Sequence, residues 1–197
     1  MGRLLSLRAV ANRSPSCVRY RMPGEGRSCP ICPASGSFFR RSPETAAATW
    51  KKTAEGMYLD SAYVAKFYVN EPDSPTVRTA IRRATSLVSS AWSLGEVSCA
   101  LHRHLREGFL DAGQVRELVR AFLEHVDAGV WTLIPVSEGT LRRVASLVSS
   151  APPGVYLRAG DAVHLATAQD IGEREIWTND RHMLAAAPHF GLAGRSV

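Results

Sequence analysis

Apolar and polar positions along residues 57–197 alternate between two kinds of pattern. Short apolar runs suited to strands occupy 57–59, 86–92, 130–136 and 175–178. Between them, apolar residues recur at helical spacing, most regularly from Val115 to Val126. Because a helical pattern follows each apolar run, we predict an α/β fold in which a mostly parallel central sheet carries helices on both faces.

The stretch from Leu157 to Gln169, LRAGDAVHLATAQ, differs from the other helical patterns because it has almost no polar face. A helix that is apolar nearly all round is a buried one. Asp161 therefore lies at the start of a buried helix, where a carboxylate either caps the helix or belongs to a site. His164, in the same helix, is interpreted as a core histidine with satisfied hydrogen bonds rather than as a catalytic base.

Four acidic residues lie where an apolar run gives way to a helix, or where the buried helix starts. Each has a structural explanation: Asp60 and Asp180 as N-caps, Glu96 in a capping box with Ser93, and Asp161 as a partner of the helix dipole. Taken together they suggest more, because the strand-to-helix junctions of a parallel sheet share one edge, where ligands bind.

Carboxylates that converge at such an edge repel one another unless a cation lies between them. An all-oxygen ligand set favours Mg²⁺, or Mn²⁺, over zinc. A site of this kind suits phosphodiester hydrolysis, since the ion activates a water molecule and neutralises charge in the transition state. The sequence does not say whether one ion or two would bind.

Motifs of other enzyme classes are missing from the sequence. A haloacid-dehalogenase-type phosphatase needs a second Asp two residues after Asp60, where this chain has Ala62. The adjacent acidic pair of a response-regulator receiver does not occur. The P-loop, the Rossmann glycine fingerprint and the GxSxG elbow do not occur either.

Net charge divides the chain into two parts. Residues 1–56 hold ten Lys and Arg against three Glu, whereas residues 57–197 hold fourteen Lys and Arg against fifteen Asp and Glu. The first part, rich in Pro, Gly, Ser and Arg, is expected to be a disordered or non-native extension, with translation starting at Met57, or else a targeting or nucleic-acid-binding arm. The overall charge of +6 therefore says nothing about the nucleic-acid affinity of residues 57–197.

Cysteine usage points to a reducing compartment, and we expect a cytoplasmic protein with no membrane association. Cys29 and Cys32 form one half of a zinc-site spacing, but no second pair follows. Cys99 is interpreted as a small core residue inside a helix. No run of about 18 apolar residues suggests a membrane span.

Four segments in this order and spacing resemble the PIN-domain toxins of bacterial VapBC toxin–antitoxin modules: YLDSAYVAKFYVNE, SSAWSLGEVSCAL, LRAGDAVHLATA and IWTNDRHML. The resemblance runs over about residues 57–197, and residues 1–56 have no counterpart. It implies a three-layer PIN-like fold over 57–197 and a metal-dependent ribonuclease toxin that cleaves structured RNA such as tRNA or rRNA. It further implies a homodimer that a cognate antitoxin protein silences.

The same resemblance implies a role for five residues. Asp60 and Asp161 would be the principal ligands of Mg²⁺ or Mn²⁺, with Glu96 and Asp180 completing the acidic set. Thr178 would place the water or the phosphate. These five residues form the expected catalytic set.

Two other functions stay open from the residues alone. One is a nuclease for housekeeping RNA or DNA processing, and the other is a non-catalytic module whose acids bind a cation or a basic peptide. Arg158 is expected to touch an RNA phosphate or to pair with an acid. Trp92 and Trp177 are expected to pack within strands, and the stripe from Val115 to Val126 to form core or a dimer and antitoxin surface.

Overall fold

The computed structural model describes residues 56–197. The expectations for residues 1–55, including the cysteine pair, lie outside the described residues. Among residues 56–197, no helix has the length and apolar character to cross a membrane.

Five short strands form the sheet, and every observed pairing between them is parallel. Strands β1, β2 and β3 are hydrogen-bonded in that order, and β4 pairs with β5. A single bridge between Leu59 and Trp177 joins the two groups, and the Asp60 N–H donates to the Trp177 carbonyl at 3.1 Å. The strand order is therefore β3-β2-β1-β4-β5, which confirms the predicted parallel α/β fold. The strands are β1 (Gly56–Tyr58), β2 (Ser86–Ser90), β3 (Trp131–Ile134), β4 (Glu175–Trp177) and β5 (Ala193–Arg195).

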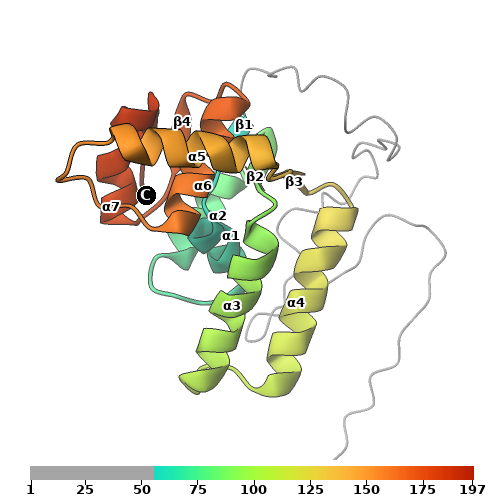
Figure 1. Ribbon diagram of the computed structural model, residues 1–197. Helices are drawn as coiled ribbons and strands as arrows, with labels where there is room; N and C mark the ends of the chain where they lie inside the picture. Colours follow the sequence, from blue (N-terminus) through green and yellow to red (C-terminus); the bar gives the residue numbers. More distant parts are fainter. Residues whose placement is uncertain (1–55) are drawn as a thin grey trace, which may run out of the picture. The chain divides into compact units, whose positions relative to one another are not determined.

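The helices fall into two packed groups. Helix α1 packs against α2 and α3, and α3 runs beside α4, whereas α5 lies over α6 (Figure 1). Right-handed crossovers place these groups on opposite faces, because the chain moves from β1 to β3 in one direction and from β3 back to β4 in the other. The helices are α1 (Ser61–Tyr68), α2 (Ser74–Ile81), α3 (Ser93–Arg106), α4 (Ala112–Asp127), α5 (Glu138–Ser150), α6 (Ala159–Asp170), α7 (Arg181–Ala186) and the 3-10 helix η2 (Ala187–Phe190).

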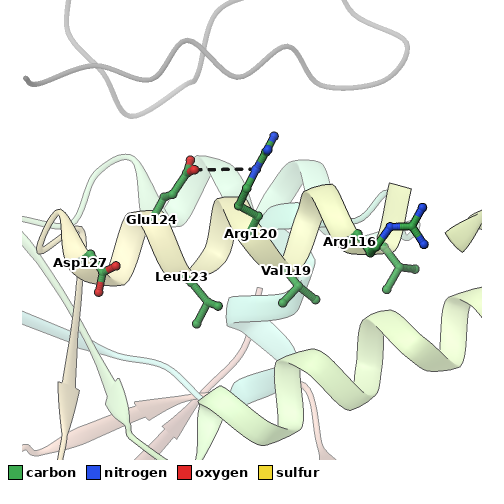
Figure 2. Close-up of a pocket in the computed structure, with 7 residues that line it drawn as sticks. Arg116, Val119, Arg120, Leu123, Glu124 and Asp127 are labelled. Carbon is green, nitrogen blue, oxygen red and sulfur yellow. Dashed lines mark ion pairs between the residues drawn. The ribbon is translucent and has the colours of Figure 1, made fainter. Parts of the chain in front are cut away.

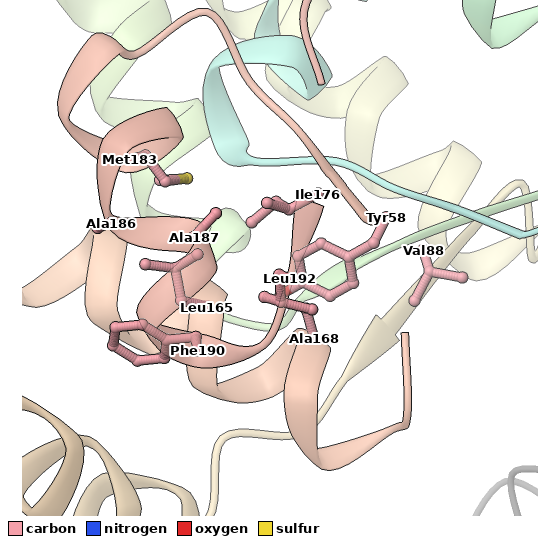
Figure 3. Close-up of a cluster of buried hydrophobic side chains, with 10 residues drawn as sticks. All are labelled: Tyr58, Val88, Leu165, Ala168, Ile176, Met183, Ala186, Ala187, Phe190 and Leu192. Carbon is pink, nitrogen blue, oxygen red and sulfur yellow. The ribbon is translucent and has the colours of Figure 1, made fainter. Parts of the chain in front are cut away.

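The core is built around α6, which is buried from Ala162 to Ala168 as its apolar sequence predicts. Figure 3 shows Leu165 and Ala168 of this helix facing strand residues and the C-terminal turn. Burying such side chains contributes about 1.5–3 kcal/mol each for the larger ones. This burial fixes the body of α6 against the sheet. The cluster consists of Tyr58, Val88, Leu165, Ala168, Ile176, Met183, Ala186, Ala187, Phe190 and Leu192.

Three details differ from the sequence-based expectations. Strand β2 ends at Ser90, so Trp92 lies at the N-cap of α3 and is 45% exposed, instead of packing inside a strand. Cys99 lies on the exposed side of α3, not in the core. The short strand β5, with its Ala-Gly-Arg sequence, carries no apolar signal and was not predicted; its pairing to β4 creates it.

Candidate active site

The acidic residues gather at the carboxyl ends of β1, β2 and β4. Asp60 follows β1, Asp180 follows β4, and Glu96 lies in the first turn after β2. After β1 the chain adds β2 and β3 along one edge of β1, and it later adds β4 along the other edge. This junction is the topological switch point of the sheet, the place where open α/β folds bind their ligands.

Asp60 is buried, and both of its carboxylate oxygens are used. Oδ1 caps α1 by accepting from the Tyr63 N–H at 2.7 Å, and Oδ2 accepts from the Thr178 hydroxyl at 2.5 Å. Burial raises the pKa of the Asp60 carboxyl, although these two hydrogen bonds oppose the shift. An ionised carboxylate at this position therefore lacks enough compensating positive charge, and a cation would stabilise it.

Thr178 connects Asp60 to Asp180. Its buried hydroxyl donates to Asp60 and accepts from the Asp180 N–H at 2.9 Å. A hydroxyl is the one small group that can donate and accept in this geometry. The structure therefore brings three of the expected site residues into one hydrogen-bonded unit.

Asp180 caps α7 with one oxygen and faces the site with the other. Oδ1 accepts from the N–H groups of His182 at 2.7 Å and Met183 at 3.2 Å, and Oδ2 accepts from Arg158. Burial acts to raise the pKa of Asp180, but the two N–H groups and the charge of Arg158 outweigh it, so the pKa is lowered. Both N-cap interpretations, for Asp60 and Asp180, are therefore correct. Each cap uses one carboxylate oxygen, and the second oxygen bonds Thr178 in one case and Arg158 in the other.

Arg158 lies between Asp161 and Asp180. Its Nε donates to Oδ2 of Asp161 at 3.0 Å, and its Nη2 donates to Oδ2 of Asp180. The backbone N–H of Arg158 also donates to Oδ2 of Asp161, at 3.4 Å. This carboxylate oxygen therefore caps the start of α6 as well. Of the two expected roles, pairing with an acid is the one observed, and the guanidinium pairs with two acids at once.

Glu96 makes no capping box. Its Oε2 lies 3.1 Å from Nε2 of His164, whose ring also bonds the Ser61 hydroxyl at 2.8 Å and the Tyr58 hydroxyl at 3.3 Å. Burial acts to raise the pKa of Glu96, but hydrogen bonds from His164 and Ser61 outweigh it and lower the pKa. His164 is a satisfied core histidine as expected, yet it also holds a site acid, which the sequence did not reveal.

A chain of buried hydroxyls supports this histidine. Ser61 bonds Ser93 at 2.9 Å, Ser93 bonds Ser89 at 2.8 Å, and Ser89 donates to the Leu59 carbonyl at 2.7 Å. Since each buried hydroxyl has a partner, the network fixes the relative positions of β1, β2 and the starts of α1 and α3. Serines inside apolar runs are the sequence signal that could have revealed it.

Gly160 allows the start of α6 to approach α3. A Cβ at this position would lie 2.3 Å from Oε1 of Glu96 and 3.2 Å from the indole nitrogen of Trp92. No residue with a side chain fits without moving the carboxylate. Gly160 therefore allows the Glu96 carboxylate to keep its position, and this close approach is a second feature that the sequence analysis missed.

No group of three or more His, Cys, Asp and Glu within residues 56–197 is arranged as a ready-made metal site. The structure instead links Asp60, Thr178 and Asp180 in one unit, Asp161 and Asp180 through Arg158, and Glu96 to His164. The residues nevertheless fit a hard divalent cation, because every acidic donor is an oxygen and a cationic guanidinium already lies between two of them.

The apolar groove along α4 is separate from these acids. Figure 2 shows Val119 and Leu123 on one side of the helix, with charged side chains beside them. The inner half of the predicted stripe, Leu118 and Phe122, is buried core. The groove is lined by Val115, Arg116, Val119, Arg120, Leu123, Glu124 and Asp127.

Comparisons with known proteins agree with this arrangement. A family model described as PIN domain matches residues 57–188. Ribonuclease VapC46 of Mycobacterium tuberculosis (strain ATCC 25618 / H37Rv) is 36% identical over 140 residues, which cover 70% of this chain and 94% of that protein. The structure of FitAB bound to the IR36 DNA fragment matches with a TM-score of 0.56 and 16% identity, over 71% of this chain and 94% of that one. This last likeness concerns the fold alone.

Proposed function

Because the chain belongs to the PIN-domain family and to its VapC-type members, we propose that it is a metal-dependent endoribonuclease. It acts as the toxin of a toxin–antitoxin module and cleaves structured RNA such as tRNA or rRNA. The observation that carries this proposal is the set of acids at the switch point of the sheet, where Arg158 already supplies a positive charge to Asp161 and Asp180.

Asp60 and Asp161 are proposed as the principal ligands of Mg²⁺ or Mn²⁺, with Glu96 and Asp180 completing the set. When bound, the ion supplies a Lewis acid that lowers the pKa of the attacking water and neutralises charge on the phosphate. The protein supplies orientation. Hydrogen bonds from Tyr63 and Thr178 fix the Asp60 carboxylate before any ligand arrives, so little reorganisation remains at the moment of reaction.

Arg158 is proposed to exchange its partners during binding. Its side chain is more than half exposed, so it can turn from the carboxylates to an RNA phosphate without losing buried contacts. Arginine suits this exchange because its planar guanidinium bonds carboxylate and phosphate oxygens in the same geometry. The exchange would release Asp161 and Asp180 to the metal as the substrate enters.

Inhibition by an antitoxin protein would have the same physical basis. A guanidinium is held by Asp161 and Asp180 within this chain. An arginine from a cognate antitoxin would form the same charge-assisted bonds and displace the metal. We therefore propose that the antitoxin silences the enzyme by inserting a cationic side chain among the acids.

The groove on α4 supports a homodimer. Along this helix Arg116 and Arg120 precede Glu124 and Asp127, with Val119 and Leu123 among the apolar residues beside them. Two copies of the helix packed antiparallel would cover both apolar faces and set the basic half of each against the acidic half of the other. Leu123→Glu should then convert the dimer to a monomer in light scattering.

The decisive experiment is induced expression of the full-length chain beside two variants. Asp161→Asn removes a proposed ligand, and Glu117→Gln removes an exposed acid on α4 as a matched control. We expect growth arrest and discrete new RNA 5′ ends with the wild type and with Glu117→Gln, and neither with Asp161→Asn. Unchanged RNA and growth with soluble wild-type protein would contradict the proposal.

A further inference from the structure

Exposed large aromatic side chains are few in the part of the chain that the structure describes, and they are unevenly placed. They are Trp92, Phe109 and Tyr156, with exposed fractions of 45%, 71% and 56%. Phe109 lies beyond the far end of α3, whereas Trp92 and Tyr156 adjoin the acidic site. An aromatic ring exposed next to a functional site offers a ligand a flat apolar face.

Trp92 adjoins the site at Glu96. It precedes α3, four residues before Glu96, and its indole nitrogen would lie 3.2 Å from a Cβ on Gly160. The same Cβ would meet Oε1 of Glu96, so the indole nitrogen and the Glu96 carboxylate lie close together. Trp92 therefore offers exposed aromatic surface beside Glu96.

Tyr156 adjoins the site near Asp180. Its ring packs on the ring of His182 with centroids 4.6 Å apart and an interplanar angle of 51°. The His182 N–H in turn donates to Asp180, and Arg158 follows Tyr156 by two residues. Tyr156 is thus held next to Asp180 by a neighbour that itself contacts the site.

A chain of contacts connects the two rings through the site. Trp92 adjoins Gly160, and the next residue, Asp161, is bonded to Arg158, which is bonded to Asp180. Asp180 is bonded to His182, which packs on Tyr156. Both exposed rings therefore connect to the proposed ligands and Arg158, Trp92 through Gly160 and Tyr156 through His182.

This arrangement matches the chemistry of single-stranded RNA. A phosphate held near Arg158 has one nucleotide on each side, and each base presents a flat face that stacks on an aromatic ring. Bases inside an A-form duplex are already stacked on one another and cannot also cover protein rings. Resting on the proposed function, we infer that Trp92 and Tyr156 are stacking subsites for the two unpaired bases that flank the scissile phosphate.

The test uses the purified full-length protein and two RNAs of the same sequence at the cut, one with that sequence in a hairpin loop and one with it fully paired. The variants are Trp92→Leu and Tyr156→Leu, each with its aromatic counterpart, Trp92→Phe and Tyr156→Phe. Phe109→Leu is the control, because Phe109 is exposed but distant from the acids. Cleavage is measured as KM and kcat at saturating Mg²⁺. Loop-RNA affinity is measured separately by anisotropy in the Asp161→Asn background, so that it does not depend on cleavage.

We expect each leucine variant to raise KM and weaken loop-RNA binding by roughly five- to a hundredfold with kcat little changed, which is the contribution of one stacked base. Phenylalanine should restore most of the affinity, and Phe109→Leu should match the wild type. The paired RNA should be cut poorly by all forms.

Two results would overturn the inference while leaving the proposed function intact. One is unchanged loop-RNA affinity in both leucine variants. If these variants lost only their inhibition by an antitoxin, the rings would contact that protein and not RNA. The other is a fall in kcat alone for Trp92→Leu, because the indole would then serve only to hold Glu96. Tight loop-RNA binding without any cleavage by the wild type would overturn the proposed function and support the stacking subsites.

Discussion

Nε2 of His164 lies 3.1 Å from Oε2 of Glu96 and connects the buried helix α6 to the first turn of α3. The same nitrogen bonds Ser61, and the other ring nitrogen bonds Tyr58. The histidine therefore cannot rotate freely. Through it, the position of a proposed metal ligand depends on packing inside the core.

Replacing His164 should affect the Mg²⁺ requirement of cleavage more than the stability of the fold. His164→Leu removes the bond to Glu96 and the bonds to the buried hydroxyls of Ser61 and Tyr58, at a cost of roughly 1–3 kcal/mol in unfolding free energy. We expect cleavage to require severalfold more Mg²⁺, whereas His164→Gln, which keeps an N–H donor, should retain more activity. Magnesium titrations of single-turnover cleavage, with urea melts beside them, measure both effects. Equal midpoints for all three proteins would contradict a positioning role.

Asp60 and Asp180 should change stability with pH in opposite directions. The folded pKa of Asp60 lies above its ordinary value of 3.8, so the metal-free fold loses stability as pH rises from about 3.8 through that raised pKa. The folded pKa of Asp180 lies below 3.8, so its contribution is present above 3.8 and is lost as pH falls through the lowered pKa.

Asparagine at each position should therefore have opposite effects on the metal-free protein at neutral pH. Asp60→Asn keeps an N-cap and removes a buried charge, so it should be at least as stable as the wild type. Asp180→Asn should be less stable. Urea unfolding from pH 3 to 8 measures this, and the idea fails if Asp60→Asn loses stability at neutral pH while Asp180→Asn gains it.

Arg158 should compete with the metal. In Arg158→Gln, Asp161 and Asp180 lose a cation and repel each other more strongly, so a divalent ion should bind better. Exposed ion pairs contribute little individually, so we expect the Mg²⁺ midpoint to fall by roughly two- to tenfold. Calorimetric titration with Mg²⁺ measures this directly. A weaker affinity in the variant would show that the arginine supports the metal site instead.

Gly160→Ala should damage the site without unfolding the protein. The added Cβ would lie 2.3 Å from Glu96 Oε1, so the flexible carboxylate must move. Alanine favours the helix by about 0.5–1 kcal/mol, so the melting temperature should hold while cleavage falls at least tenfold.

Gly95→Ala is the matched control for this substitution. It lies in α3, its added Cβ would meet nothing within 4 Å, and it should gain the same helix preference with full cleavage. Parallel melts and cleavage assays compare the two glycines. If both variants cleave like the wild type, the close approach at Gly160 has no functional role.

The order of strands and helices and the placement of the acids could be predicted from sequence, because both depend on local pattern. A strand or a helix shows its period over a few residues, and Asp60, Glu96 and Asp180 each follow an apolar run within four residues. The buried character of α6 is equally local, since its apolar residues leave no face for solvent. The edge that the acids share then follows from the parallel sheet.

Only the tertiary structure decided which groups meet. The pairing of Arg158 with Asp180, the bond between His164 and Glu96 and the tight approach at Gly160 each join segments far apart in the chain. Strand β5 exists because β4 offers it an edge, and Trp92 is exposed because β2 ends two residues before it. These contacts depend on strand order, crossover hand and the depth to which one helix packs on another, and no short stretch of sequence contains that information.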